Sequence, residues 1–449
     1  SLMSPKANTQ QKSADVILRR LVWLYIILVV TEGALRKWFL PSFSDSLLII
    51  RDPIALFSYA VALHHKCFPL NRFILVGLSL GVMMSLTTIL FGHGNWLIAA
   101  FGFRVNILHF PFAFIMGRVL YRSDVVEIGK WWLWTTIPMT IILALQFELP
   151  QSAWINQSIG GKEGIGFTGG MGRFRPTGTF SFTNGTTLFY TFAIAFLMGG
   201  LTQHKRYSKL LLGLSSIAIL LALPLSISRS MLLISAFIVL VGLLCTAMQK
   251  MALMRYARIL LALAAGLFIA NQIPIFDDAK DAFLARWEKA TNIDHTGIRD
   301  SILMRTFNMF ADPLLNNDDA TALGVGLGAG TNVGSKLLTG ERQFLHGESE
   351  WHRIIGESGI ILGLSYILWR VWLVVRLTRL SIRTLLKGNG LPVILLACNG
   401  FNILIAQIGQ TTVYGFTIVG IGITIAAMRQ SPQIAQSTKI TPQSPITDQ

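Results

Sequence analysis

The stretch His346–Gly363, HGESEWHRIIGESGIILG, lies where a long polar segment gives way to apolar sequence. Read as a helix at about 100° per residue, it places four ionisable side chains on one narrow face. These are His346, Glu350, Arg353 and Glu357. Glu348 and His352 share the opposite side. Charges that run toward a bilayer are costly unless they face a protein cavity or water. The cluster therefore indicates a functional site, and the alternative for any single residue is a solvated helix end.

The apolar sequence around this stretch determines the class of protein. Of the 449 residues, 52% are hydrophobic and only 13% are charged, whereas soluble domains carry about 25% charged residues. Repeated apolar runs of roughly 20 residues are typical of a polytopic helical membrane protein. The formal net charge of +16 could indicate binding of nucleic acid. Lys and Arg in cytoplasmic loops explain it more simply, so we expect no nucleic-acid partner.

About 12 apolar segments are expected to cross the membrane as α-helices. They are approximately 21–40, 47–63, 73–91, 100–120, 131–147, 184–201, 210–226, 231–247, 259–273, 354–376, 391–407 and 414–428. With the N-terminus in the cytoplasm, the even-numbered connections carry most of the Lys and Arg, as the positive-inside rule requires. The sequence therefore predicts an all-α polytopic membrane protein with both termini in the cytoplasm.

These segments divide the chain into five regions. They are a cytoplasmic tail (1–20), nine spans (21–273) with an outer loop at 148–183, a large outer loop (274–345), three spans (346–428) and a disordered cytoplasmic tail (429–449). The large loop contains two expected amphipathic helices, near 277–290 and 298–311. It also contains the segment LGVGLGAGTNVG (323–334), which we interpret as a tightly turned or flexible loop because a nucleotide-binding turn would follow a strand.

Several arginines are expected on the outer side, where short loops normally avoid them. They are Arg36, Arg51, Arg104, Arg173, Arg175, Arg229, Arg299 and Arg353. An arginine in or near the membrane is by default a functional-site hypothesis, and its planar fork of donors binds phosphate. The alternatives for each are a position among lipid headgroups or an ion pair with Glu32, Asp52 or Glu163. As a set, the arginines predict a site for a lipid pyrophosphate.

Such a site could support sugar transfer from a polyprenyl pyrophosphate. The leaving group gains negative charge as the glycosidic bond breaks, and preorganised cations stabilise that charge. The acceptor hydroxyl needs a general base, and candidates are His346, Glu348, Glu350 and His352. The sequence requires no metal or other cofactor.

Three patches resemble the O-antigen ligase and O-antigen polymerase superfamily of bacterial membrane glycosyltransferases. They are Arg175-Pro176-Thr177-Gly178-Thr179-Phe180 with Asn184, Ser228-Arg229-Ser230, and the outer loop from Arg299 through Asp312-Pro313 to the segment at 346–363. The resemblance implies a GT-C-like fold in the bacterial inner membrane, with Arg229 and Arg299 on the phosphates and His346 as the base. The spacing from His346 to Glu357 departs from the family pattern, so the base stays open among His346, Glu348 and Glu350.

The sequence thus predicts a metal-independent transferase that passes a glycan from a polyprenyl-pyrophosphate donor to a glycan or lipid-linked sugar at the periplasmic face. The predicted catalytic residues are His346, Glu348 and Glu350, and the predicted pyrophosphate-binding residues are Arg173, Arg175, Arg229, Arg299 and Arg353. One alternative is a membrane transporter for an anion such as bicarbonate. Others are a metal-dependent transferase that uses Glu32 and Asp45, and a structural partner in a polysaccharide export complex.

Overall fold

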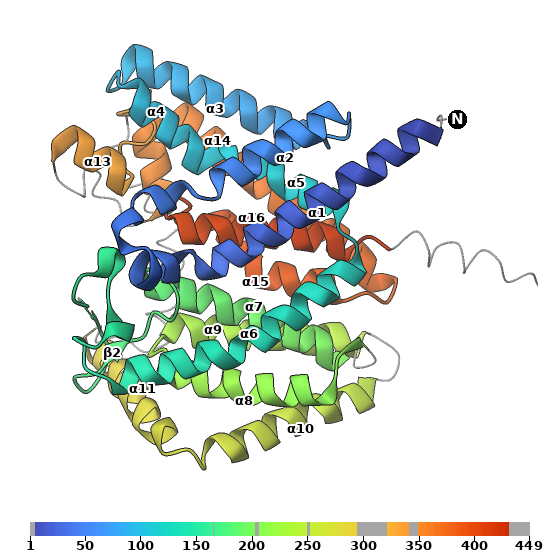
Figure 1. Ribbon diagram of the computed structural model, residues 1–449, viewed down its shortest axis with the longest axis vertical. Coiled ribbons are helices and arrows are strands. Elements are labelled where there is room, and N and C mark those ends of the chain that lie inside the picture. Colours follow the sequence, from blue (N-terminus) through green and yellow to red (C-terminus); the bar gives the residue numbers. More distant parts are fainter. Residues whose placement is uncertain are drawn as a thin grey trace, which may run out of the picture.

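A computed structural model describes residues 5–164, 166–202, 206–248, 252–293, 321–340 and 349–430. This part of the chain is a bundle of helices that lie side by side (Figure 1). Its strands, β1 (Phe167–Thr168) and β2 (Phe174–Arg175), pair antiparallel as a short hairpin. The expectation of an all-α architecture is therefore confirmed for the part of the chain that is described.

The helices follow the expected apolar segments closely. The first are α1 (Pro5–Ala34), α2 (Asp52–His64), α3 (Arg72–Phe91), α4 (Trp96–Phe103), α5 (Phe110–Val119), α6 (Arg122–Glu148), α7 (Thr183–Thr202) and α8 (Lys209–Leu225). The others are α9 (Arg229–Ala247), α10 (Ala252–Ala270), α11 (Pro274–Ile293), α13 (Asn332–Thr339), α14 (Glu350–Leu386), α15 (Leu391–Ile405) and α16 (Thr411–Ala427). Two π-helical turns, η1 (Leu35–Phe39) and η4 (Arg104–Leu108), continue α1 and α4, and short 3₁₀ turns lie at Pro41–Phe43, Ser46–Ile49, Trp154–Asn156 and Ile159–Gly161. The first expected amphipathic helix corresponds to α11, and the second lies outside the described residues.

The helices identify a multi-pass membrane protein. Within the described ranges, seven are long and apolar enough to cross a bilayer, or eight if α10 and α11, which meet at 100°, form one broken span. The expected number of 12 is not reached by these criteria, although each of the 12 segments contains helix. One reason is that α8, α15 and α16 have only 17, 15 and 17 residues, at or below the lower limit for a span.

Burial differs between helices as a membrane bundle requires. Leu75, Leu86 and Leu90 of α3 are 49%, 52% and 68% exposed, which suits contact with lipid but not with water. In contrast, 89% of an 18-residue stretch of α7 is buried inside the bundle. Trp132 of α6 stacks on Phe189 of α7, with ring centroids 5.5 Å apart. The core is therefore built around α7.

Both described ends of the chain lie at one end of the bundle, which we call the terminal end (Figure 1). Arg19 of α1 forms an ion pair with Asp124 of α6 at 3.2 Å, and Arg429, which follows α16, lies over the ring of Tyr121 at 4.6 Å. The β-hairpin, α11 and α13 lie at the opposite end, which we call the loop end.

Candidate functional site

Three arginines from distant parts of the sequence come together at the loop end. Arg175 lies in β2, Arg229 begins α9 and Arg286 belongs to α11. Among the described residues, none of the three forms an ion pair with Asp or Glu. We call Arg175, Arg229 and Arg286 the arginine cluster.

The hairpin brings Arg175 to Arg286. Gly169 donates to the carbonyl of Arg173 at 3.0 Å, and the turn between them contains Gly172 with φ of 74°. Gly170 packs so tightly on α11 that a Cβ there would lie 2.0 Å from the carbonyl oxygen of Ala282. Arg286 in turn donates through Nη1 to the carbonyl of Thr168 at 2.5 Å. Hairpin and helix are thus joined at the cluster.

The start of α9 adds further positive potential. Ser228 caps this helix, because its Oγ accepts the N–H of Met231 at 3.3 Å. Helix N-termini carry partial positive charge and unpaired N–H groups, so they favour anions. Arg229 is the first residue of that helix. The helix start and the guanidinium of Arg229 therefore both favour the binding of an anion.

Positive charge is concentrated around Arg175. Burial, together with the positive charges of Arg286 and Arg229, lowers the pKa of Arg175 to about 10. Its side chain is still charged at neutral pH, and its Nε has no hydrogen-bond partner among the described residues. Like charges held close together are unfavourable. A phosphate oxyanion would relieve the repulsion and accept from several donors at once.

Arg173 lies beside the cluster but is differently engaged. It approaches Glu148 and Asp278 at 3.8 Å each and donates to the carbonyl of Phe147 at 3.2 Å. These ion pairs are long and partly exposed, and such pairs stabilise a fold little. Of the five predicted pyrophosphate-binding residues, the structure thus brings together Arg175 and Arg229, with Arg173 next to them.

Glu350, Arg353, Glu357 and Arg370 form a second, buried group of charges on α14, which we call the buried network. Arg353 donates to both oxygens of Glu350, at 3.0 and 2.8 Å, and to Glu357 at 2.9 Å. Arg370 donates to Glu350 at 3.1 Å. Two cations and two carboxylates balance each other, as buried charges require. The predicted helix face therefore exists, and it points into the protein.

This arrangement differs from the roles predicted for Glu350 and Arg353. All three nitrogens of Arg353 are engaged, since Nη2 also donates to Asn106 at 2.8 Å, so no nitrogen is left free for a pyrophosphate. Both oxygens of Glu350 accept from arginines, which disfavours a role as a base. In the described structure both residues hold the start of α14 in place.

The other predicted residues fall into two groups. His346, Glu348 and Arg299 lie outside the described residues. His352 has a local role at the start of α14, where its Nδ1 lies 2.9 Å from the Oγ of the capping residue Ser349.

The outer arginines of the first spans form ion pairs with acidic side chains, which is the alternative to phosphate binding for these residues. Arg36 and Arg51 both approach Glu32, at 3.6 and 3.0 Å, and Arg104 pairs with Asp52. Each of these three side chains therefore has a carboxylate partner inside the bundle, and none of them belongs to the arginine cluster.

The Gly-rich segment closes a break in α14 at Gly359, where φ is 74°. Val325 and Gly326 donate to the carbonyls of Gly356 and Glu357, each at 2.9 Å, and Ile360 donates to Thr321 at 3.1 Å. These bonds satisfy backbone groups that the break would leave unpaired in a membrane. The segment is thus a tightly turned loop whose backbone hydrogen-bonds to the broken turn of α14, which agrees with the interpretation as a turned loop.

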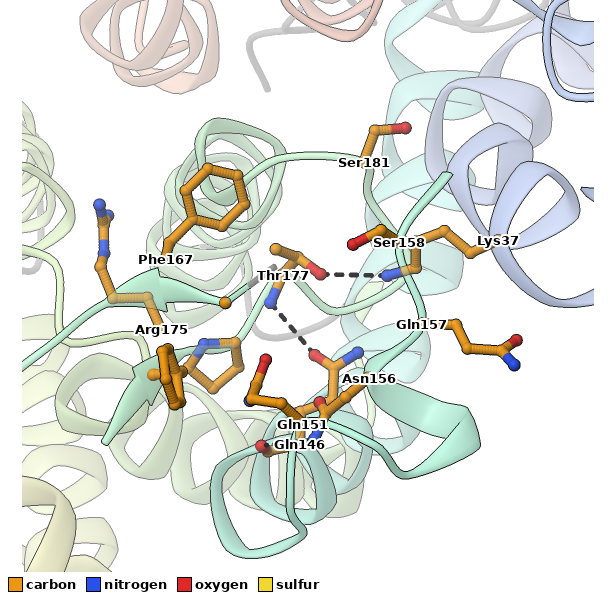
Figure 2. A pocket seen from close by; sticks show the side chains of 13 residues that line it. Lys37, Gln146, Gln151, Asn156, Gln157, Ser158, Phe167, Arg175, Thr177 and Ser181 are labelled. Carbon is orange, nitrogen blue, oxygen red and sulfur yellow. Dashed lines mark hydrogen bonds between the residues drawn. The ribbon is translucent and has the colours of Figure 1, made fainter. Parts of the chain in front are cut away.

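A pocket open to solvent lies beside the cluster and shares Arg175 with it (Figure 2). Two side chains hold the turn that follows Arg175. Lys37 donates to Thr177 at 3.0 Å and to the carbonyls of Gly178 and Phe180 at 2.7 and 3.1 Å. The Oε1 of Gln146 accepts the N–H groups of Thr177 and Gly178 at 3.1 and 2.7 Å. The Arg-Pro-Thr-Gly-Thr-Phe stretch is therefore rigidly positioned.

No family model, curated protein or solved structure matches this chain. Arg286 and Lys37 are not among the site residues that the sequence predicts. Arg286 lies in the expected amphipathic helix of the outer loop, where a charged residue gives no special signal. Lys37 lies at the end of the first apolar segment, and such a lysine is an unusual feature that could have marked it.

Proposed function

We propose that this chain is a membrane glycosyltransferase that moves a glycan from a polyprenyl-pyrophosphate carrier to a sugar hydroxyl, as O-antigen polymerases and ligases do. The main observation in support of this proposal is the arginine cluster. It supplies three guanidinium groups with no carboxylate partner among the described residues, next to the start of α9. This is the chemistry that recognises a diphosphate.

The cluster would act on the charge of the leaving group. The acceptor hydroxyl attacks the anomeric carbon of the donor, and the bond from that carbon to the phosphate oxygen breaks. The electron pair stays on the pyrophosphate, where Arg175, Arg229 and Arg286 stabilise it. The proton of the hydroxyl passes to a base. We assign the base to His346 or Glu348, because Glu350 is fully engaged in the buried network.

The proposed site lies on the periplasmic side of a bacterial inner membrane. Basic side chains at the terminal end support this orientation, since the positive-inside rule places them in the cytoplasm. They include Arg19, Arg20, Arg122 and Arg429. In this topology all 12 apolar segments cross the bilayer in a GT-C-like arrangement, with α8, α15 and α16 spanning a thinner part of it.

The anion transporter remains the second candidate because α14 is broken at Gly359. Transporters often bind ions at interrupted helices. Here the Gly-rich segment fills the break with its own hydrogen bonds, which favours the transferase. Uptake of labelled bicarbonate into proteoliposomes that contain no lipid-linked sugar would favour the transporter instead.

The test is transfer by the purified chain in proteoliposomes supplied with polyprenyl-pyrophosphate glycans from the native bacterium. Removing one preorganised donor from an oxyanion site costs about 10²–10³ in rate, so Arg229→Ala should lose at least about a hundredfold. Arg379→Ala is the matched control, because Arg379 is an exposed arginine of α14 outside the cluster. Full activity of Arg229→Ala at a normal protein level would refute the proposal.

A further inference from the structure

The pocket at the loop end has the lining of a carbohydrate site. The polar side chains around it include Gln151, Asn156 and Ser181, and two aromatic rings complete it, Phe167 and Phe174. No Asp or Glu is present among the described residues that line it. A bare metal cation would therefore meet only neutral groups and the charges of Arg175 and Lys37, and a lipid tail would meet a mainly polar wall.

The polar groups of the pocket are unequally engaged. Lys37 and Gln146 form hydrogen bonds with the turn at 177–180. The amide of Gln151, in contrast, forms no hydrogen bond with the other residues drawn in Figure 2, and the Nε of Arg175 has no hydrogen-bond partner within the described part of the chain. An amide both donates and accepts. It therefore suits a ligand whose hydroxyl groups also do both.

The two aromatic rings provide an apolar contact beside these polar groups. Phe167 and Phe174 are 36% and 37% exposed, and they lie on the paired strands of the hairpin. The ring of Phe167 also packs edge to face on Phe182, with ring centroids 5.9 Å apart. A pyranose has an apolar face of C–H groups as well as hydroxyls, and such a face packs on the negative face of an aromatic ring. Amide, hydroxyl and ring together fit a sugar.

Arg175 connects the pocket to the arginine cluster, because it lines the one and belongs to the other. We propose that the pocket binds the sugar that is directly attached to the diphosphate of the donor, while the cluster holds the diphosphate itself. This assignment rests on the proposed function and specifies its donor subsite. Arg175 would then contact the phosphate from the sugar side.

The test measures two ligands separately on the full chain in lipid nanodiscs. The probes are inorganic pyrophosphate and a set of free oligosaccharides that contain glucose, galactose, rhamnose or N-acetylglucosamine. Gln151→Ala removes the side-chain amide. Gly166→Ala crowds the lining of the pocket, because its Cβ would lie 2.2 Å from the ring of Phe174 and 2.6 Å from the Oε1 of Gln151. Gln272→Ala, at an exposed glutamine outside the pocket, is the control.

We expect at least one oligosaccharide to bind the unchanged chain. One hydrogen bond contributes about 0.5–1.5 kcal/mol, so Gln151→Ala should weaken that binding about fivefold, and Gly166→Ala should weaken it at least as much. Gln272→Ala should leave it unchanged. Binding that neither pocket variant weakens would overturn the inference.

The two probes separate this inference from the proposed function. Binding of pyrophosphate without any oligosaccharide would overturn the sugar pocket and leave the proposed function standing. Binding of an oligosaccharide that Gln151→Ala weakens, without any binding of pyrophosphate, would support the sugar pocket and overturn the proposed function.

Discussion

Replacing Glu350 by glutamine should destabilise the whole bundle. Glu350 is 1% exposed and accepts hydrogen bonds from both Arg353 and Arg370. Glu350→Gln keeps the size of the side chain but removes its negative charge. The buried network then holds two cations and the single carboxylate of Glu357, so one positive charge is left uncompensated away from water.

The expected cost follows from the burial of this group. Removing one partner of a buried ion pair destabilises a protein by about 3–5 kcal/mol, because the remaining charge is unpaired. Unfolding entropy is about 2.1 cal/mol/K per residue, so a chain of 449 residues has roughly 0.9 kcal/mol/K. A loss of about 4 kcal/mol then lowers Tm by about 4 °C. The shift is larger if only part of the bundle unfolds.

The assay is thermal unfolding of the purified chain in one detergent, followed by intrinsic fluorescence. Glu127→Gln is the matched control, since Glu127 pairs with Lys130 on the surface of α6 with side chains 61% and 33% exposed. Surface pairs contribute about 0–1 kcal/mol, so this variant should change Tm by about 1 °C or less. The double variant Glu350→Gln with Arg370→Met restores the charge balance and should recover part of the lost stability.

Two results would contradict this reasoning. The first is a Tm for Glu350→Gln equal to that of Glu127→Gln. The second is a stable Glu350→Gln protein that has lost transfer activity, which would return Glu350 to the role of the base.

Three further predictions concern the loop end and the break in α14. Gly359→Ala should lower the stability of the fold by about 1–3 kcal/mol, because φ is 74° and its Cβ would lie 2.3 Å from a carbonyl oxygen. Gly213→Ala in α8 is the control, since its Cβ meets open space and the change should be neutral or stabilising by up to about 1 kcal/mol. Thermal unfolding compares the two variants. Arg286→Ala should weaken pyrophosphate binding about 10–100-fold in calorimetry, since hydrogen bonds to charged groups contribute about 1.5–3 kcal/mol, and unchanged affinity would remove this residue from the cluster. Lys37→Met should speed hydrogen exchange at the amides of the turn that Lys37 holds and weaken pyrophosphate binding indirectly, and a turn that stays protected would show that the lysine is dispensable.

Part of the candidate site was predictable because its signal is local. The apolar segments and the basic connections at the terminal end place Arg175 and Arg229 together on one side of a membrane bundle. The period of a helix likewise puts Glu350, Arg353 and Glu357 on one face. Each of these inferences uses residues within one element or the order of elements along the chain.

The tertiary structure decided which charges are free and which are paired. In the sequence Arg36, Arg51 and Arg104 look like Arg229, since all stand near the outer ends of apolar segments. Glu32 and Asp52 form ion pairs with the first three, and no such partner reaches Arg229 within the described residues.

The sequence by itself determined that this chain is a helical membrane protein. Only the tertiary structure decided that Arg286 completes the cluster and that the Gly-rich segment closes the break at Gly359. The physical reason is that hydrophobic periodicity is set by neighbouring residues. Ion pairs and backbone hydrogen bonds between separate segments instead join residues that are far apart in the chain and meet only when the helices pack.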